Sequence, residues 1–379
     1  MKPLLLAALL ALALPLPAQD TDQDAPAESS ADYTRTVAEK TRVLADDPHN
    51  VMAFCDRGYA YSELGKYAEA AADYNSAVQL APDFVLAYVN RGINNGLAGH
   101  PDQELEDEAH ALSLDPRNSA ARSARGLAYF RQGKFDRAID DFDVAIDPEA
   151  NAGSPDEESP PSGFRDSAGN FQGIVGVDTL DEHLYYYRGM AYLKLGRPDR
   201  ALADLNKSVL VEPAYFPAYA GRAECFQKQG DTPRAIAEYD RLVELAPKAG
   251  LIARGNYYGD HGDPARALAD FQRLLSLDPL SALAYNARAW MLATGPAGRD
   301  GHAAIADAMK ACELSHWRDT NSIDTLAAAY AETGDFEQAL KWQTKAAALL
   351  NPGQSVEDIT EIKDHLALYQ QHKPLHREK

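Results

Sequence analysis

Seven arginines recur along this sequence, and each is followed by an acidic residue. The acid stands 16 residues after the arginine in every pair but the last, in which the separation is 19 residues. A guanidinium group binds carboxylates and other planar anions through paired hydrogen bonds. The pattern therefore fits either a ladder for an anionic ligand or a series of structural ion pairs. The pairs are Arg57 and Asp73, Arg91 and Asp107, Arg125 and Asp141, Arg188 and Asp204, Arg222 and Glu238, Arg254 and Asp270, and Arg288 and Asp307.

A further stretch, residues 320–352, resembles the segments that carry these pairs but lacks the two charges, and this favours the structural interpretation. It carries Leu326 and Trp342 at the two positions, so both charges are lost together. A buried arginine without its acid would be very costly, which makes a joint loss the expected outcome for an ion pair. The partners could lie within one repeating unit or bridge two neighbours. Glu39 fits the bridging version, because it could serve Arg57.

No motif for catalysis, metal binding or cofactor binding is present. The sequence contains no HExxH, GxSxG, paired CxxC or phosphate-binding loop, and Gly295–Gly301 lacks the lysine and hydroxyl residue that such a loop needs. His261 lies among acids, but the pattern places it in a turn between helices. We therefore expect no enzyme activity, no metal and no cofactor. The many other Asp and Glu residues are interpreted as solvated helix faces.

Charge and cysteine content narrow the class of partner. The net charge of −20 makes nucleic acid and anionic membranes poor partners. Three cysteines, at positions 55, 225 and 312, are an odd number spread widely along the chain, so we expect no disulfide framework.

Residues 1–18 have the pattern of a secretory signal peptide. Lys2 precedes the apolar run Leu4–Leu14, and Ala18 is a suitable cleavage end. The run is too short to span a bilayer. We therefore expect an exported protein, periplasmic or secreted, with no membrane span after cleavage. The alternative is an uncleaved anchor, which Pro15 and Pro17 disfavour because they break the run.

The elements that would position these residues repeat with a period of 34. Gly58, Gly92 and Gly126 are 34 residues apart, as are Pro82 and Pro116. Stretches such as RGYAYSELGKYAEAAADYNSAVQLAP and RGLAYFRQGKFDRAIDDFDVAI share small and aromatic residues in register. The chain resembles the tetratricopeptide repeat family, and in particular its bacterial exported members. The resemblance implies an all-α fold, a right-handed α-solenoid of about eight helix–turn–helix repeats.

The register predicts the organisation of the chain. A disordered acidic leader is expected at 19–31, and a leading helix with three repeats at 33–147. An acidic insertion rich in Pro, Ser and Gly is expected at 148–181, either disordered or packed on the groove. Five more repeats follow at 182–352, and a capping helix with a polar tail at 353–379. The repeats are predicted at 51–84, 85–118, 119–147, 182–215, 216–247, 248–281, 282–318 and 320–352.

The resemblance also implies where a partner would bind. In this family the first helix of each repeat lines a concave groove, and here the corresponding positions are mainly apolar or aromatic in the N-terminal half. The alternative is that superhelical packing buries these side chains. The candidate peptide-binding residues are Met52, Tyr59, Leu86, Val89, Ile93, Phe130, Tyr186, Met190 and Trp290.

The expected function is therefore a scaffold or assembly factor that binds protein or peptide segments in this groove. The family's carboxylate clamp is not expected, because only Asn90 fits it, whereas Cys55, Tyr59, Ala120 and Ala124 stand at its other positions. The alternative is a structural or self-associating subunit of an envelope complex with no open groove, in which a homo-oligomer forms.

Overall fold

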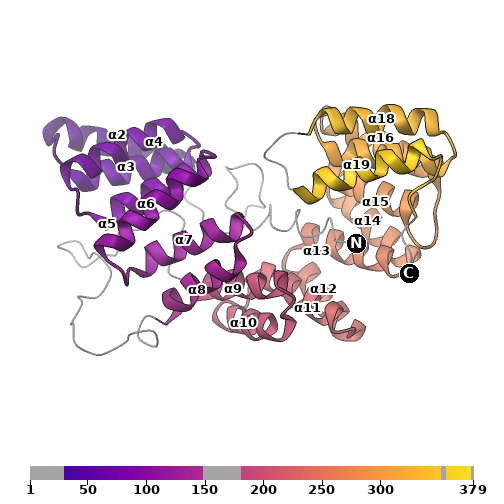
Figure 1. The fold of residues 1–379 in the computed structure, drawn as a ribbon, viewed down its shortest axis with the longest axis horizontal. Helices are drawn as coiled ribbons and strands as arrows, with labels where there is room; N and C mark the ends of the chain where they lie inside the picture. Colours follow the sequence, from indigo (N-terminus) through magenta and orange to yellow (C-terminus); the bar gives the residue numbers. More distant parts are fainter. Residues whose placement is uncertain (1–29, 148–180, 351–355, 377–379) are drawn as a thin grey trace. The chain divides into compact units, whose positions relative to one another are not determined.

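The computed structural model describes residues 30–147, 181–350 and 356–376. Within these ranges the chain forms the α-helices α2–α19 and no strand (Figure 1). The predicted signal peptide, nearly all of the predicted acidic leader and nearly all of the insertion lie outside the described residues.

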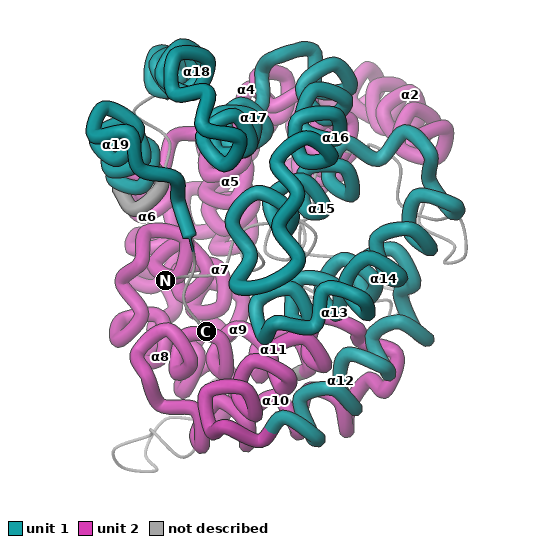
Figure 2. The backbone as a smooth tube through the Cα atoms, turned by 90° about the vertical axis from the view of Figure 1, so that its right-hand side faces the viewer, with its two compact units in different colours: residues 1–6, 232–379 teal, residues 7–231 magenta. Residues whose placement is uncertain are grey.

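The described helices belong to two compact units, residues 7–231 and residues 232–379 (Figure 2). The first contains α2 (Ser30–Asp46), α3 (Val51–Glu63), α4 (Tyr67–Leu80), α5 (Val85–Leu97), α6 (Pro101–Leu114), α7 (Ser119–Arg131), α8 (Phe135–Ile146), α9 (Asp181–Lys194), α10 (Pro198–Val211) and α11 (Phe216–Lys228). The second contains α12 (Thr232–Leu245), α13 (Pro247–Asp260), α14 (Pro264–Leu277), α15 (Ala282–Thr294), α16 (Gly301–Leu314), α17 (Thr320–Glu332), α18 (Phe336–Ala348) and α19 (Val356–Gln370).

Within each unit, consecutive helices pack as pairs, and each pair stacks on the next. Helix α3 packs on α4, α5 on α6 and α7 on α8, and the contacts α4–α5 and α6–α7 join these pairs. The same order holds for α13 with α14, α15 with α16 and α17 with α18. The prediction of an all-α solenoid built from helix–turn–helix repeats is confirmed.

Repeat one shows how the sequence produces this unit. A Cβ atom on Gly58 of α3 would lie 2.8 Å from the ring of Tyr74 of α4, so only glycine permits this close approach. Gly65 has a φ of 69°, which ends α3 in a left-handed turn. The N–H of Lys66 then donates to the carbonyl of Tyr61 at 2.8 Å, and α4 can begin. On α4, Ala70 is fully buried as the small residue of the contact.

Repeat two replaces this apolar contact with acids. Glu104 and Glu108 of α6 are 2% and 0% exposed, so the interpretation of acids as solvated helix faces is wrong at these two positions. Their carboxyl groups lie where a Cβ atom on Gly96 or Gly92 of α5 would be, within 2.7 Å. Glycine on α5 thus makes room for a carboxyl group on α6. Glu104 also pairs with Arg131 of α7.

Two helices without a repeat partner flank the pairs. Helix α2 begins at Ser30 rather than at the predicted Tyr33 and packs on α3. Helix α19 packs on α18 and α17, and its apolar stripe is buried, with Ile362 at 3% and Tyr369 at 0% exposure. It therefore covers the end of the repeat stack, as expected of a capping helix.

Polar contacts also hold α19 in place. Nδ1 of His365 lies 2.9 Å and 3.1 Å from the two carboxylate oxygens of Asp324 on α17. The amide of Gln343 on α18 donates to the same carboxylate at 2.5 Å and to the carbonyl of Ile362 at 3.0 Å. The ring of Trp290 on α15 lies 6.0 Å from that of His365.

Candidate functional site

The recurring arginines and acids form ion pairs inside the repeats. In repeat one, Nε and Nη2 of Arg57 donate to the two oxygens of Asp73 at 2.8 Å and 2.7 Å. The two residues come from α3 and α4, so the pair fastens the two helices of one repeat. The same fork joins Arg91 to Asp107, Arg125 to Asp141, Arg188 to Asp204, Arg254 to Asp270 and Arg288 to Asp307.

The remaining arginine nitrogen, Nη1, also reaches the preceding repeat in several cases. Nη1 of Arg57 donates to Thr41 of α2 at 3.1 Å, a place for which the sequence suggested Glu39. The pairing thus acts within repeats and between them. The other contacts of this kind join Arg91 to Asn75 at 2.8 Å, Arg188 to Asp143 at 2.7 Å and Arg254 to Asp240 at 2.6 Å.

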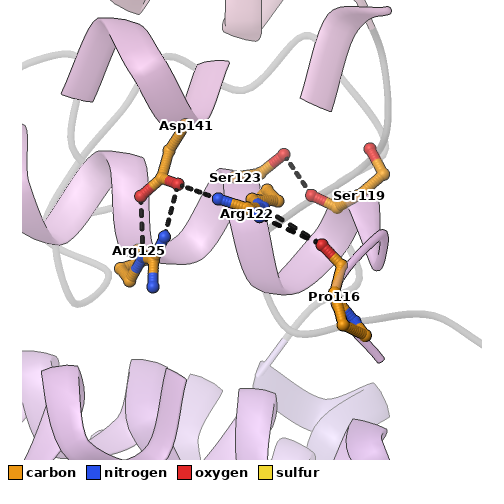
Figure 3. Close-up of polar contacts among 6 residues, drawn as sticks. All are labelled: Pro116, Ser119, Arg122, Ser123, Arg125 and Asp141. Atoms are coloured by element: carbon orange, nitrogen blue, oxygen red, sulfur yellow. Dashed lines mark hydrogen bonds and ion pairs between the residues drawn. The ribbon is translucent and has the colours of Figure 1, made fainter. Parts of the chain in front are cut away.

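In repeat three, the acid of the ion pair accepts from a second arginine of the same helix, and not only from the recurring one (Figure 3). The position that corresponds to Asn75 is Ala109, which offers no oxygen on its side chain. Instead, Asp141 accepts from Arg122 at 2.9 Å as well as from Arg125 at 2.7 Å (Figure 3). Hydrogen bonding to Asp141 raises the pKa of Arg125 further above its ordinary value.

These guanidinium groups are poorly placed for an anionic ligand. The Asp73 and Asp141 side chains are only 6% and 3% exposed, and each already occupies the fork of its arginine. A ligand would have to displace a buried carboxylate. The observed geometry therefore favours the structural interpretation. The pairing predicted between Arg222 and Glu238 stays a prediction.

A pocket of about 280 Å³ lies between α2, α3 and α5. Three of the nine predicted groove residues, Met52, Tyr59 and Leu86, line it. Cys55 and Asn90, which stand at two positions of the family's carboxylate clamp, also line the pocket. The complete lining is Tyr33, Thr36, Glu39, Lys40, Met52, Cys55, Asp56, Tyr59, Leu86 and Asn90.

Sequence reasoning missed the contribution of α2 to this pocket. Tyr33, Thr36, Glu39 and Lys40 belong to this helix, which the pattern treated only as a leading half-repeat. Tyr33 packs edge-on against Tyr59, with ring centroids 5.8 Å apart. Tyr33 was the sequence signal for this contribution. An aromatic residue at the start of a helix that flanks the first repeat needs an apolar surface to pack on.

The cysteine that lines the pocket is not a reactive nucleophile. The thiol of Cys55 is 2% exposed, and burial, with additions from Asp56 and Asp73, raises its pKa to about 12. The thiol is therefore protonated at neutral pH and is a poor nucleophile. The other two cysteines are also unpaired by disulfides and buried. In the described part of the chain, no three His, Cys, Asp or Glu side chains gather as metal ligands would.

Most of the other predicted groove residues lie in the interior. Val89, Phe130, Tyr186 and Met190 are between 1% and 6% exposed, which leaves almost no surface for a partner. Phe130 stacks edge-on against Tyr187 at 5.6 Å. Burial was the alternative at these positions, and packing between successive first helices produces it.

The last two candidates are half-buried. Ile93 packs against the clusters around Tyr88 and Tyr74. Trp290 packs into the core of residues 232–379 beside α19, so its ring takes part in the capping contact.

The fold defines the class of protein, which is an α-solenoid of stacked helix–turn–helix repeats. Family models described as tetratricopeptide repeat match residues 51–84, 108–155, 186–250 and 252–311, together more than half of the chain. The chain belongs to the tetratricopeptide repeat family. Members of this family are typically non-catalytic scaffolds.

Relatives share the repeats over part of their length. The DnaJ homolog subfamily C member 7 homolog of Dictyostelium discoideum is 26% identical over 229 residues, which is 56% of this chain and 37% of that protein. The human DnaJ homolog subfamily C member 3 is 29% identical over 178 residues, 46% of this chain and 32% of that protein. The chain thus spans well under half the length of these relatives.

Solved structures show the same fold. A tetratricopeptide repeat protein from Parabacteroides merdae superposes with a TM-score of 0.53 at 16% identity, covering 84% of this chain and 98% of that one. PilW, a type IV pilus biogenesis factor, gives 0.50 at 17% identity, covering 62% and 96%. Together, the repeats and the relatives indicate a protein–protein interaction scaffold. Over the described residues, no helix is both long enough and apolar enough to cross a membrane.

Proposed function

We propose that this protein binds a peptide segment of a partner protein in the pocket between α2, α3 and α5, and so serves as a scaffold or assembly factor. The observation that carries the proposal is the pocket itself. It opens beside the first helices of repeats one and two, where the family's groove begins, and it contains Met52, Tyr59 and Leu86.

The pocket lies at the small end of the range for ligand sites, and its lining suits a side chain of a peptide. Pockets for drug-sized ligands usually measure about 300–1,000 Å³, and this one, at about 280 Å³, is smaller. Its lining combines apolar side chains and tyrosines with an amide and three charged residues, and protein interfaces likewise join an apolar core to a polar rim. The pocket is large enough for one bulky anchoring side chain, and the rest of the segment would lie along α3 and α5.

The alternative is a structural or self-associating subunit without an open groove. The burial of Val89, Phe130, Tyr186 and Met190 favours it, because further along the chain the predicted groove positions are filled. Sedimentation over a wide concentration range separates the two: a stable oligomer that masks the pocket supports the alternative.

The test compares capture of partners by three forms of the protein. Tyr59→Ala removes one wall of the pocket, and Tyr192→Ala is the matched control, a half-buried tyrosine on α9 outside the pocket lining. A partner bound by the unsubstituted protein and by the control, but lost with Tyr59→Ala, supports the proposal. Equal capture by all three forms, each shown to be helical by circular dichroism, contradicts it.

The compartment is part of the proposal. The apolar run Leu4–Leu14 after Lys2, ending at Ala18, supports export to the periplasm or the medium. The partner would then be a protein of the cell envelope or its surroundings, and the length of the mature chain tests this expectation.

A further inference from the structure

We infer that the pocket selects peptide segments in which a large apolar side chain lies next to a lysine or arginine. The inference rests on the proposed function, since it describes which segments the same pocket accepts. Two features of the pocket carry it: the apolar and aromatic side chains of its lining, which we call the interior, and its charged side chains, which we call the rim.

The interior favours an apolar anchor. Met52 of α3 and Leu86 of α5 line it together with the buried thiol of Cys55, which stays neutral. Tyr33 and Tyr59 meet edge to face and add aromatic surface to the same pocket. A ligand side chain that enters gains by leaving water for apolar surroundings, whereas a charged side chain would lose its hydration there.

The rim favours a cation. The charged residues of the lining are Glu39, Lys40 and Asp56, two carboxylates and one ammonium. Nζ of Lys40 lies 2.9 Å from Asp56 and 3.9 Å from Glu39. The single lysine is thus held mainly by Asp56, and the side chain of Glu39, 65% exposed, contributes the surplus negative charge.

An acidic ligand finds little to bind. Lys40 is the only basic residue that lines the pocket in the described structure, and Asp56 already engages it. The net charge of −20 also repels anionic segments and attracts basic ones at long range. A peptide with a cation beside its apolar anchor satisfies both the interior and the rim.

A displayed library of random peptides tests the inference and the proposed function separately. The library is selected on the protein, and each enriched peptide is then tested on the Tyr59→Ala variant. Tyr59-dependent peptides that share an apolar residue next to Lys or Arg support the inference. Tyr59-dependent peptides without enrichment of Lys or Arg overturn the inference and leave the proposed function standing. If no enriched peptide depends on Tyr59, both fail.

Matched variants then measure the contribution of the rim. The best peptide is compared with a form in which its lysine or arginine is glutamine. We expect Glu39→Gln to weaken binding of the basic peptide about two- to fivefold, the range for an exposed ion pair, and to leave the glutamine form unchanged. Glu106→Gln removes an exposed acid of α6 outside the lining and should change neither. Equal losses for both peptides with Glu39→Gln would contradict a role for its charge.

Discussion

At the scale of single residues, Glu108 is the side chain most at odds with its surroundings. Other repeats have Tyr74, Phe142, Leu205 or Phe271 at this position, and each is fully buried. Glu108 is also fully buried, and neither of its carboxyl oxygens has a hydrogen-bond partner in the described structure. Burial, with Glu104 and Asp107 nearby, raises its pKa well above the usual range.

We expect Glu108→Leu to stabilise the protein at neutral pH. Leu205 occupies the same position under Gly189 in repeat four, so the repeat accommodates leucine there. The gain should be about 1 kcal/mol. Because the pKa of Glu108 is higher in the folded than in the unfolded protein, the folded protein loses stability as pH rises above the unfolded-state pKa of about 4.3. The advantage of leucine should therefore be smaller at pH 4.5 than at pH 7.5.

Thermal unfolding at the two pH values measures this difference. Glu106→Leu, an exposed change on the same helix, is the control and should leave the melting temperature unchanged at both. A Glu108→Leu protein that melts lower at pH 7.5 than the unsubstituted protein would show that the carboxyl group makes a stabilising contact.

The prediction of ion pairs drew on two positions that vary together, whereas the acids of α6 had to be interpreted one position at a time. The joint loss of charge at Leu326 and Trp342 pointed to ion pairs, which the geometry of Arg57 and Asp73 illustrates. The repeat register places Glu104 and Glu108 where other repeats have small and aromatic residues, but their burial was not predicted, because an acid on a helix normally faces water. For Glu104, the sequence signal for burial was Gly96 on the facing helix, because a glycine there leaves space for a long side chain.

At the scale of elements, the contact between His365 and Asp324 joins α19 to α17. Burial lowers the pKa of His365, but the hydrogen bond and charge of Asp324, helped by Glu361 and Asp364, outweigh it, and the pKa is raised. The stabilising contribution is therefore complete below the unfolded value of about 6.5 and is lost as pH rises through the folded-state pKa.

We expect His365→Gln to lower the melting temperature of the protein more at pH 6 than at pH 8.5. The protonated imidazole forms an ion pair with Asp324 at the lower pH, and glutamine retains only the hydrogen-bonding capacity. Scanning calorimetry at the two pH values measures the difference. His302→Gln, at an exposed position of α16, controls for a general effect of histidine. A loss that is the same at both pH values would show that packing, and not charge, holds α19.

Elements were predictable because each repeat carries its own start and stop signals. Gly65 and Pro82 mark the turn within repeat one and the end of its second helix. The pocket was not predictable in the same way, because it forms where α2, α3 and α5 meet. The periodic pattern of one helix does not predict which side chains will line a pocket between three helices.

At the scale of the whole molecule, the solenoid fold followed from local sequence because each repeat packs mainly on its neighbours. A long-range topology was not needed to infer α3 on α4 or α4 on α5. The proposed export is a separate matter, since the argument for it rests on the sequence of residues 1–18 and not on the repeats.

We expect the chain, produced in full in a Gram-negative host, to leave the cytoplasm and to begin at Gln19 after cleavage. Leu9→Arg should block export, because an arginine in the apolar run costs about 2.5–3.5 kcal/mol on insertion. Leu210→Arg is the matched control: this leucine is 82% exposed on α10, and export should be unaffected. Cell fractionation and the intact mass measure both. Full-length protein that stays in the cytoplasm would contradict the export proposal, and its partners would then have to be sought there.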